Sequence, residues 1–461
     1  MTRRHGALVL ATAVALSLGI AGQVPAATPR LATTAPVRLE GSSGSSEPRI
    51  AVDPRTDRRY AVTNAKDGSA VVYASRDGRA FARVKGDIPG QISPTIDLDV
   101  LVTPSGRLIA NELDSDFSFP TGYSDDGGAT WKSSAGIPND LDRQWLAAGP
   151  KGQVYLVWHN FVSGLTPAHE VMVQTSTDGG ATFGAPVPVA PPGSAAALDL
   201  GCGDSTGPSG IAVDQRTGRL YVAFATRTSA VGGGCGKAAD ASEGIGFNVV
   251  PSNHVWVATS PDGSLGSWTD SLAVDTAAAR RFVALQYAGI SVDGASNVWL
   301  SYTESVRPDD YTSEVRLRSA PAGGTAWRRP VVVPRTQGGS LFALVAAGDA
   351  GKVAVSWLAL GADSLWYPRL AVSTDALGRT PHWTQTALSQ EPTHRGSPAA
   401  MSAACGTGPT SGLQQGLVCG RYLDNFGIAV DRAGRAMVVW PSHLQNATLV
   451  ATQTAGPDVR R

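Results

Sequence analysis

Two stretches of the sequence, Ser124-Asp125-Asp126-Gly127-Gly128-Ala129-Thr130-Trp131 and Ser176-Thr177-Asp178-Gly179-Gly180-Ala181-Thr182-Phe183, are nearly identical. Each carries a carboxylate, two glycines and an aromatic residue in the same order. The carboxylate can accept hydrogen bonds from amides of its own turn, and glycine can take the left-handed conformation. The aromatic ring can pack against a neighbouring unit. The string therefore predicts a tight turn between two strands, repeated along the chain.

Looser copies of the string surround Asp77, Asp262 and Asp375, whereas Ser319 to Trp327 keeps the glycines and lacks the aspartate. Asp77 and Asp126 lie 49 residues apart, and Asp126 and Asp178 lie 52 residues apart. Known propeller blades repeat about every 40–50 residues. The spacing therefore favours a propeller.

Seven pairs of short apolar segments accompany these turns. Their continuous apolar runs, without clean alternation, are typical of strands buried on both faces, as between packed blades. Turns rich in Gly, Pro and Asp join the members of a pair. The pairs are Ile50–Asp53 with Tyr60–Val62, Ile96–Val102 with Leu108–Ala110, Trp145–Ala148 with Val154–Trp158, Ile211–Asp214 with Leu220–Phe224, Ile290–Asp293 with Val298–Tyr302, Leu344–Ala347 with Val353–Trp357, and Ile428–Asp431 with Ala436–Trp440.

The sequence thus predicts an all-β fold, a single β-propeller of about seven four-stranded blades, with six as the alternative. The seventh unit stops after Thr448–Ala451, so we expect its fourth strand to come from the N-terminal segment around Val37–Leu39. That pairing would close the ring and remove exposed sheet edges. The expected division is 1–26 signal peptide, 27–46 N-terminal segment with the closing strand, and 47–461 propeller.

The N-terminus has the pattern of an export signal. Arg3 and Arg4 precede the apolar run Ala7–Ile20, and Val24-Pro25-Ala26 fits a cleavage site near Ala26. The Sec and twin-arginine routes both stay open. No later run is apolar for long enough to span a bilayer. We therefore expect a secreted, extracellular protein.

Four cysteines follow this signal, and none forms a Cys-x-x-Cys pair. An even number in an oxidising compartment predicts disulfides rather than a thiolate metal site. We expect the pairs Cys202–Cys235 and Cys405–Cys419, each bracing a loop.

The repeated strings are Asp boxes, also called BNR repeats, and over nearly the whole mature chain the sequence resembles the sialidase (neuraminidase) propellers. The resemblance implies three arginines that hold a substrate carboxylate, a tyrosine–glutamate nucleophile and an acid–base aspartate. Glu47-Pro48-Arg49-Ile50-Ala51 stands where that family has an aromatic-Arg-Ile-Pro string, but its flanking residues differ. Seven blades also differ from the six typical of catalytic members.

By position in the chain, Arg143 and Arg421 are the candidates to complete an arginine cluster with Arg49, because both precede an innermost strand. Guanidinium groups suit a carboxylate because they donate paired, charge-assisted hydrogen bonds. The candidates for the nucleophile are Tyr422, Tyr287 or Tyr302 with Glu304 or Glu112.

The two faces of a propeller differ in what builds them. Turns between first and second and between third and fourth strands share one face, the Asp-box face, where Asp77, Asp126, Asp178, Asp262 and Asp375 are expected to be structural. The opposite face, here called the loop face, carries the connections between blades, where ligand sites usually lie.

On the loop face, Asp142-Arg143-Gln144-Trp145 joins an aromatic surface to a bidentate donor, which suits a sugar; inter-blade packing of Trp145 with an Asp142–Arg143 pair is the equal alternative. The expected binding residues are Arg143, Trp145, His159 and Asp424. Glu112–Asp116 offers oxygen ligands for calcium but lacks the glycine and final glutamate of an EF-hand loop, which favours a solvated acidic loop.

The function expected is recognition of an extracellular glycan or glycoconjugate on the loop face, with exo-sialidase hydrolysis left open. The alternative is a non-catalytic propeller that binds protein or acts as an assembly scaffold. The net charge is zero and the basic residues are scattered, so nothing suggests a nucleic-acid partner. We expect no cofactor, no metal ion and a monomer.

Overall fold

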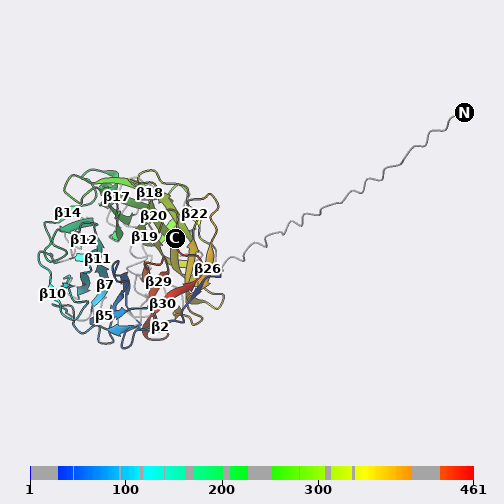
Figure 1. Ribbon diagram of the computed structural model, residues 1–461. Coiled ribbons are helices and arrows are strands. Elements are labelled where there is room, and N and C mark those ends of the chain that lie inside the picture. Colours follow the sequence, from blue (N-terminus) through cyan, green and yellow to red (C-terminus); the bar gives the residue numbers. More distant parts are fainter. Residues whose placement is uncertain are drawn as a thin grey trace.

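The computed structural model describes residues 1, 30–44, 46–92, 95–114, 118–139, 141–160, 171–200, 208–226, 252–279, 281–306, 313–334, 338–395 and 426–460. They form seven antiparallel sheets that follow one another around a ring (Figure 1). The innermost strand of each sheet comes first in its unit. The prediction of a seven-bladed, all-β propeller is confirmed, and the six-bladed alternative is wrong.

The first four blades are built from consecutive strands. A short helix, α1 (Ala195–Leu200), precedes blade 4. Blade 1 is β3 (Arg49–Val52), β4 (Arg59–Asn64), β5 (Ala70–Ser75) and β6 (Ala82–Arg83); blade 2 is β7 (Thr95–Val102), β8 (Leu108–Asp114), β9 (Thr121–Ser124) and β10 (Lys132–Ser133); blade 3 is β11 (Leu141–Ala148), β12 (Val154–Asn160), β13 (Val171–Ser176) and β14 (Val187–Pro188); blade 4 is β15 (Pro208–Val213), β16 (Leu220–Thr226), β17 (His254–Ser260) and β18 (Thr269–Asp275).

The remaining three blades complete the ring, and the last of them uses both ends of the described chain. Blade 5 is β19 (Phe282–Val292), β20 (Val298–Ser305), β21 (Glu314–Ala320) and β22 (Val331–Val332); blade 6 is β23 (Ser340–Ala347), β24 (Val353–Leu360), β25 (Leu365–Ser373) and β26 (Thr384–Ala387), with β27 (His394–Arg395) also on β25; blade 7 is β28 (Gly427–Val430), β29 (Ala436–Ser442) and β30 (Ala447–Ala455), with β1 (Ala32–Thr33) and β2 (Val37–Arg38) on β30.

The core lies between blades, where apolar side chains from facing sheets pack together. The second strands β4, β8, β16 and β20 are buried along their whole length. Their counterparts β12, β24 and β29 each contain a fully buried tryptophan, Trp158, Trp357 and Trp440. Burial on both faces explains why these strands read as continuous apolar runs.

The N-terminal segment supplies the outer strand of blade 7, so the predicted closure is confirmed. Val37 pairs with Val450 in β30, and Ala32 pairs with Ala455. The pairing extends beyond the predicted Val37–Leu39, because β1 continues it along the same strand. In Figure 1, β2 lies beside β30, next to blade 1. This joint leaves no open gap between the last blade and the first.

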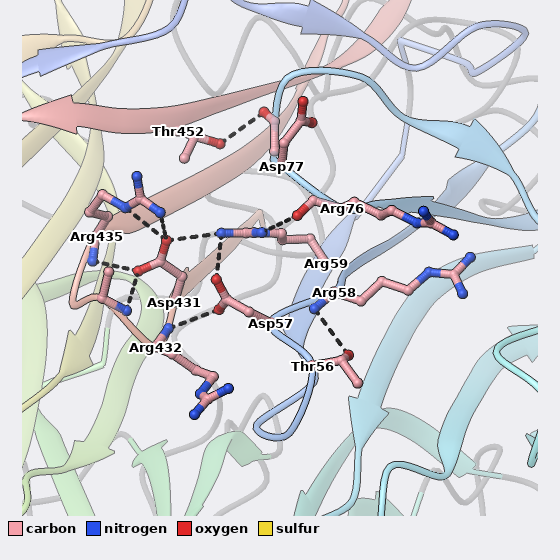
Figure 2. A network of polar contacts seen from close by, with 12 residues as sticks. Thr56, Asp57, Arg58, Arg59, Arg76, Asp77, Asp431, Arg432, Arg435 and Thr452 are labelled. Atoms are coloured by element: carbon pink, nitrogen blue, oxygen red, sulfur yellow. Dashed lines mark hydrogen bonds and ion pairs between the residues drawn. The ribbon is translucent and has the colours of Figure 1, made fainter.

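A buried ion network reinforces the joint between blades 7 and 1 (Figure 2). Asp431 is 0% exposed, and its Oδ2 lies 3.0 Å from Arg59 Nη2 and 2.8 Å from Arg435 Nη2. Arg59, itself 3% exposed, also lies 2.9 Å from Asp57 Oδ2. Asp57 Oδ1 accepts a hydrogen bond from the Arg432 amide at 2.9 Å, so the network crosses the joint twice.

The Asp boxes lie between third and fourth strands, and each aspartate accepts hydrogen bonds inside its own turn. Asp178 Oδ1 accepts from the amides of Ala181 and Thr182 at 3.0 and 2.9 Å, and Oδ2 accepts from the Thr182 hydroxyl at 2.7 Å. These bonds, led by that from the Thr182 hydroxyl, lower the pKa of Asp178 to about 2. Equivalent bonds are accepted by Asp77, Asp126, Asp262 and Asp375.

Glycine in the box is required by packing as well as by its conformation. Gly128 has a φ of 91°, and a Cβ there would lie 2.8 Å from Cβ of Val84 in blade 1. A side chain would therefore meet the preceding blade, which ties the box sequence to blade-to-blade packing.

Some predictions fall outside the described residues. Residues 2–29 include the expected signal peptide and its cleavage site, and Cys202, Cys235, Cys405 and Cys419 are also outside. Export and the two disulfides therefore stay predictions. Among the described residues, no helix has the length and hydropathy needed to cross a membrane.

The closing ion network gives the first testable prediction. Replacing Asp431 with asparagine keeps an acceptor for the turn amides of Ala433 and Arg435, but removes the charge facing buried Arg59. Because one partner of a buried pair is lost, Asp431→Asn should lower the free energy of unfolding by about 3 kcal/mol in urea titrations.

The control is the exposed pair Arg83–Asp87, whose side chains are 52% and 66% exposed. Asp87→Asn should change stability by less than about 0.5 kcal/mol, because exposed pairs are weak. Equal effects of the two variants would contradict a special role for Asp431 in closure.

Candidate binding site at the ring axis

The innermost strands of five consecutive blades are irregular near the loop face. In blades 2 to 6, the pairing between first and second strands shifts register close to where the first strand begins. Such bulges bend a strand and re-aim its side chains, and they are common beside functional sites. The shifts lie between Thr95 and Leu98, Asp142 and Trp145, Pro208 and Gly210, Val283 and Ala288, and Leu341 and Leu344.

These bulges change where Arg143 lies. It was expected to precede its strand, but β11 begins at Leu141, so Arg143 sits inside the bulge with a φ of 56°. Phe342 takes the corresponding place in β23 with a φ of 55°. A left-handed residue with a side chain is uncommon and costs on the order of 1 kcal/mol. The surrounding packing holds both residues in this conformation.

Arg49 and Trp145, predicted separately, are in direct contact. The Arg49 guanidinium carbon lies 3.9 Å from the Trp145 ring centroid, a cation–π contact between blades 1 and 3. The indole Nε1 of Trp145 donates to the Pro208 carbonyl in blade 4 at 2.8 Å. Arg49 Nη1 donates to the Phe426 carbonyl beside blade 7 at 3.4 Å. The pair therefore ties four blades together near the axis.

Carboxylates surround the Arg49 guanidinium. Asp99 is 9% exposed, and its two oxygens accept hydrogen bonds from the amides of Leu146 at 2.6 Å and Val100 at 2.8 Å. Burial raises the pKa of Asp99 to about 6, although the nearby positive charge of Arg49 opposes this rise. Burial likewise lowers the pKa of Arg49, against the charges of Asp99, Glu47 and Asp97.

Three polar side chains of this region have buried hydrogen-bonding atoms that are unused. Within the described part of the chain, Arg49 Nε, Gln144 Oε1 and both amide atoms of Asn111 have no hydrogen-bond partner. Gln144 is held through its other atom, because Nε2 donates to the Asp97 carbonyl at 2.8 Å. Asn111 pairs in register with Asp99. Within the described residues such atoms also occur in many other parts of the ring, and four of them lie in this region beside Arg49 and Asp99.

His159 and Asp142 form a second polar pair, at the loop-face end of blade 3. His159 Nε2 lies 3.1 Å from Asp142 Oδ2, while Asp142 Oδ1 accepts from the Arg143 amide at 2.9 Å. Burial opposes the charge of Asp142, but the hydrogen bond and charge of His159, with the charge of Arg143, outweigh it and lower its pKa. His159 is thus held as a partner of Asp142.

Two of the candidate nucleophile residues, Glu304 and Tyr302, are held by other partners. Glu304 Oε1 lies 2.7 Å from Arg281 Nη1 and 3.7 Å from Arg316 Nη2, so two arginines of blade 5 hold it. Tyr302 is 1% exposed and belongs to the core between blades 4 and 5, where burial raises the pKa of its phenol. For Tyr287 only the backbone, in β19, is described, and Arg421, Tyr422 and Asp424 lie outside the described residues.

The acidic run considered for calcium is only partly described. Glu112 and Asp114 are fully buried at the end of β8, and Asp114 Oδ2 accepts from the Ile92 amide at 2.7 Å. The expectation of a solvated acidic loop is therefore wrong for these two residues, because β8 is buried along its whole length. Ser115 and Asp116 lie outside the described residues. Nowhere in the described chain do three His, Cys, Asp or Glu side chains gather as metal ligands.

Sequence reasoning missed the residues that complete these groups. Arg281 was not singled out as a partner of Glu304, although the two lie near the paired ends of β19 and β20. The backbone carbonyls of Pro208 and Phe426 cannot be identified as hydrogen-bond acceptors from the pattern of side chains in the sequence. Glu47 had a signal, because it stands two residues before Arg49 in the same string.

Comparison with known proteins places the chain by fold alone. No family model and no curated protein sequence matches it. A protein of unknown function from Dyadobacter fermentans shares 12% identity and superposes with a TM-score of 0.50, covering 94% of this chain and 100% of that one. An ulvan lyase of polysaccharide lyase family PL25, bound to GlcA(1-4)Rha3S, shares 10% identity with a TM-score of 0.53, covering 92% and 96%. Membership of the sialidases is not shown.

The Asp99 environment gives a pH prediction. Its folded pKa of about 6 lies above the unfolded value of about 3.9, so the folded state binds the extra proton between those values. Stability from this group is therefore present below pH 4 and is lost as the pH rises through 6. Relative to Asp99→Asn, the wild-type protein should lose stability from pH 4 to pH 7, measured by urea unfolding.

The readout is the change of the unfolding free energy with pH and not its value at one pH. The substitution also changes the hydrogen bond from the Leu146 amide, and that change alters stability at every pH. The exposed variant Asp87→Asn should keep the wild-type slope. The quantity compared is the free energy of unfolding of the wild type minus that of Asp99→Asn. If this difference stays constant or increases as the pH rises, the raised pKa of a buried Asp99 carboxyl group is contradicted.

Proposed function

We propose that this chain is an exported propeller that binds an extracellular glycan on its loop face, around Arg49 and Trp145. The observation that carries the proposal is the stack of Arg49 on Trp145 at 3.9 Å, beside the buried carboxylate of Asp99. It joins a planar donor, an aromatic ring and acceptor oxygens at the axis.

This combination matches what sugars require. Hydroxyl groups need both donors and acceptors, which guanidinium nitrogens and carboxylate oxygens supply. Trp145 is 3% exposed and packs in the core between blades 3 and 4, as in the alternative of inter-blade packing, so its ring holds the Arg49 guanidinium in place and does not itself receive the sugar. The run of bulges in blades 2 to 6 supports a functional role for this end of the innermost strands.

The comparison with the ulvan lyase supports the proposal only by analogy of fold, since a shared propeller does not fix a function. Sialidase-type hydrolysis has weaker support. Glu304 is engaged by Arg281 and Arg316, and Tyr302 is buried in the core. Binding is therefore the function that the described geometry supports best.

The test is an array of defined neutral, sialylated, uronate-bearing and sulfated oligosaccharides, probed with the wild-type protein and Arg49→Lys. Lysine keeps the charge but loses the planar group that stacks on Trp145, so binding to the saccharide found should weaken by about tenfold. Arg83→Lys is the control, because Arg83 is 52% exposed on the outer strand of blade 1.

No ligand on the array, or equal binding by both proteins, would sink the proposal. A stoichiometric protein complex that forms equally with Arg49→Lys would favour the scaffold alternative. Melting curves of each variant establish that a loss of binding is not a loss of fold.

A further inference from the structure

A cavity of about 680 Å³ lies between blades 5 and 6, away from the axial site. Its walls come from the start of β20, the end of β21, the segment before β22 and the turn between β25 and β26. That turn is the Asp box of blade 6, so the cavity belongs to the Asp-box face. The lining residues are Trp299, Leu317, Ser319, Arg328, Arg329, Pro330, Val331, Ala376, Leu377, Gly378 and Arg379.

In four other joints of the ring, a box glycine fills the corresponding place. The second residues of β4, β8, β12 and β16 each meet a glycine of the next blade's box: a Cβ at Gly180 would lie 2.6 Å from Ile109, and one at Gly324 would lie 3.0 Å from Tyr221. These close approaches leave little room between neighbouring blades. The same pattern holds for Gly127 with Tyr60 and Gly263 with Tyr155.

At the joint between blades 5 and 6, this contact is replaced. Trp299 occupies the second position of β20, but the box that follows reads Asp375-Ala376-Leu377-Gly378. Its aspartate accepts from the amide of His382, seven residues on, so the turn is wider than in blades 2 and 3. Leu377 packs toward Gly351 of its own blade, where a Cβ would lie 3.2 Å away. A wider turn without the paired glycines accounts for the cavity.

The cavity is rimmed by positive charge. Arg328, Arg329 and Arg379 line it, and its lining contains no acidic residue. All three are exposed. Among the described residues, none of the three guanidinium groups has an ion pair or a side-chain hydrogen bond, unlike Arg59 or Arg281. The box of blade 5 has Pro321 where other boxes have aspartate.

The floor of the cavity is apolar and fixed. Trp299 is fully buried there, and its Nε1 donates to Asp293 Oδ2 at 3.0 Å. The same oxygen accepts from the Gly351 amide of blade 6 at 2.9 Å, so one carboxylate ties the floor to both blades. A preformed apolar floor below a charged rim is the usual build of a ligand pocket, and the volume is within the usual range.

We propose that this cavity is a second ligand site, which binds an acidic saccharide through its oxyanion groups. Guanidinium groups donate paired hydrogen bonds to the planar or tetrahedral oxygens of carboxylates, sulfates and phosphates. The accessible apolar side chains of the lining, Leu377, Pro330 and Val331, receive the sugar ring, while the rim excludes cations and favours anions. This site is independent of the axial site, since no lining residue contacts Arg49 or Trp145.

The test is isothermal titration with four probes: a sulfated disaccharide, a uronate-bearing disaccharide, a sugar phosphate and a neutral disaccharide of equal size. The proteins are wild type, Arg328→Gln/Arg379→Gln, the axial variant Arg49→Lys and the control Arg76→Gln/Arg79→Gln. The control removes the same charge from exposed arginines of the blade 1 Asp box, on the same face. Thermal melts check that each protein is folded.

At least one anionic probe should bind the wild type and the control alike, and should bind Arg328→Gln/Arg379→Gln about tenfold more weakly. Which anion binds identifies the oxyanion that the site prefers. The neutral disaccharide should not bind there. Binding of no anion, or equal weakening in both double variants, would overturn the proposal. Binding that is lost in Arg49→Lys and kept in the double variant would place the anion at the axis instead.

Discussion

The ring depends on one joint, where the N-terminal segment adds to the outer edge of the last blade. Hydrogen bonds from the Thr34 and Leu39 amides to β30, at 2.8 and 3.0 Å, continue the sheet across the two ends of the chain. The ion pair of Asp431 with Arg59 lies at the same joint, together with a hydrogen bond from the Thr452 hydroxyl to the Gly78 carbonyl at 3.0 Å. Without this pairing, blade 7 would present an open edge.

The joint also positions the axial site. Arg49 opens β3, the first strand after the closing segment, and it reaches the Phe426 carbonyl just before β28. The backbones of β28 and β3 approach each other closely here: a Cβ at Gly427 would lie 2.9 Å from the Ile50 amide nitrogen. The contact of Arg49 with Trp145 therefore depends on blades 7 and 1 meeting correctly.

The Asp-box face and the loop face differ in how their polar groups are satisfied. Asp-box carboxylates such as Asp126 and Asp178 are satisfied by their own turns, which leaves them little capacity for chemistry. On the loop face, bulges and left-handed residues carry strain, and buried polar atoms keep unused hydrogen-bonding capacity. The exception on the Asp-box face is the joint of blades 5 and 6, where the regular box is altered on both sides and a cavity appears.

Much of the fold could be predicted from the sequence, because inter-blade burial leaves continuous apolar runs and the turns carry Asp–Gly signatures. Closure through Val37 followed from the incomplete seventh unit. The site was harder to predict. Arg49 and Trp145 were both candidates, yet their contact spans 96 residues of sequence and depends on the curvature of the ring. The bulge at Arg143 arises from packing at the axis, which no local pattern records. The altered boxes at Ser319 and Asp375 were visible as departures, but the cavity between them was not.

Closure is the constraint that everything else in this account rests on, and hydrogen exchange measured by mass spectrometry tests it most directly. The comparison is between the mature protein and a variant that lacks residues 30–39. Loss of the closing strand should remove protection from β30, and also from β28 and β3, since those strands meet at the same joint. Unchanged protection in β28 and β3 would show that the ring and its axial site hold together without the N-terminal segment, and would contradict this account.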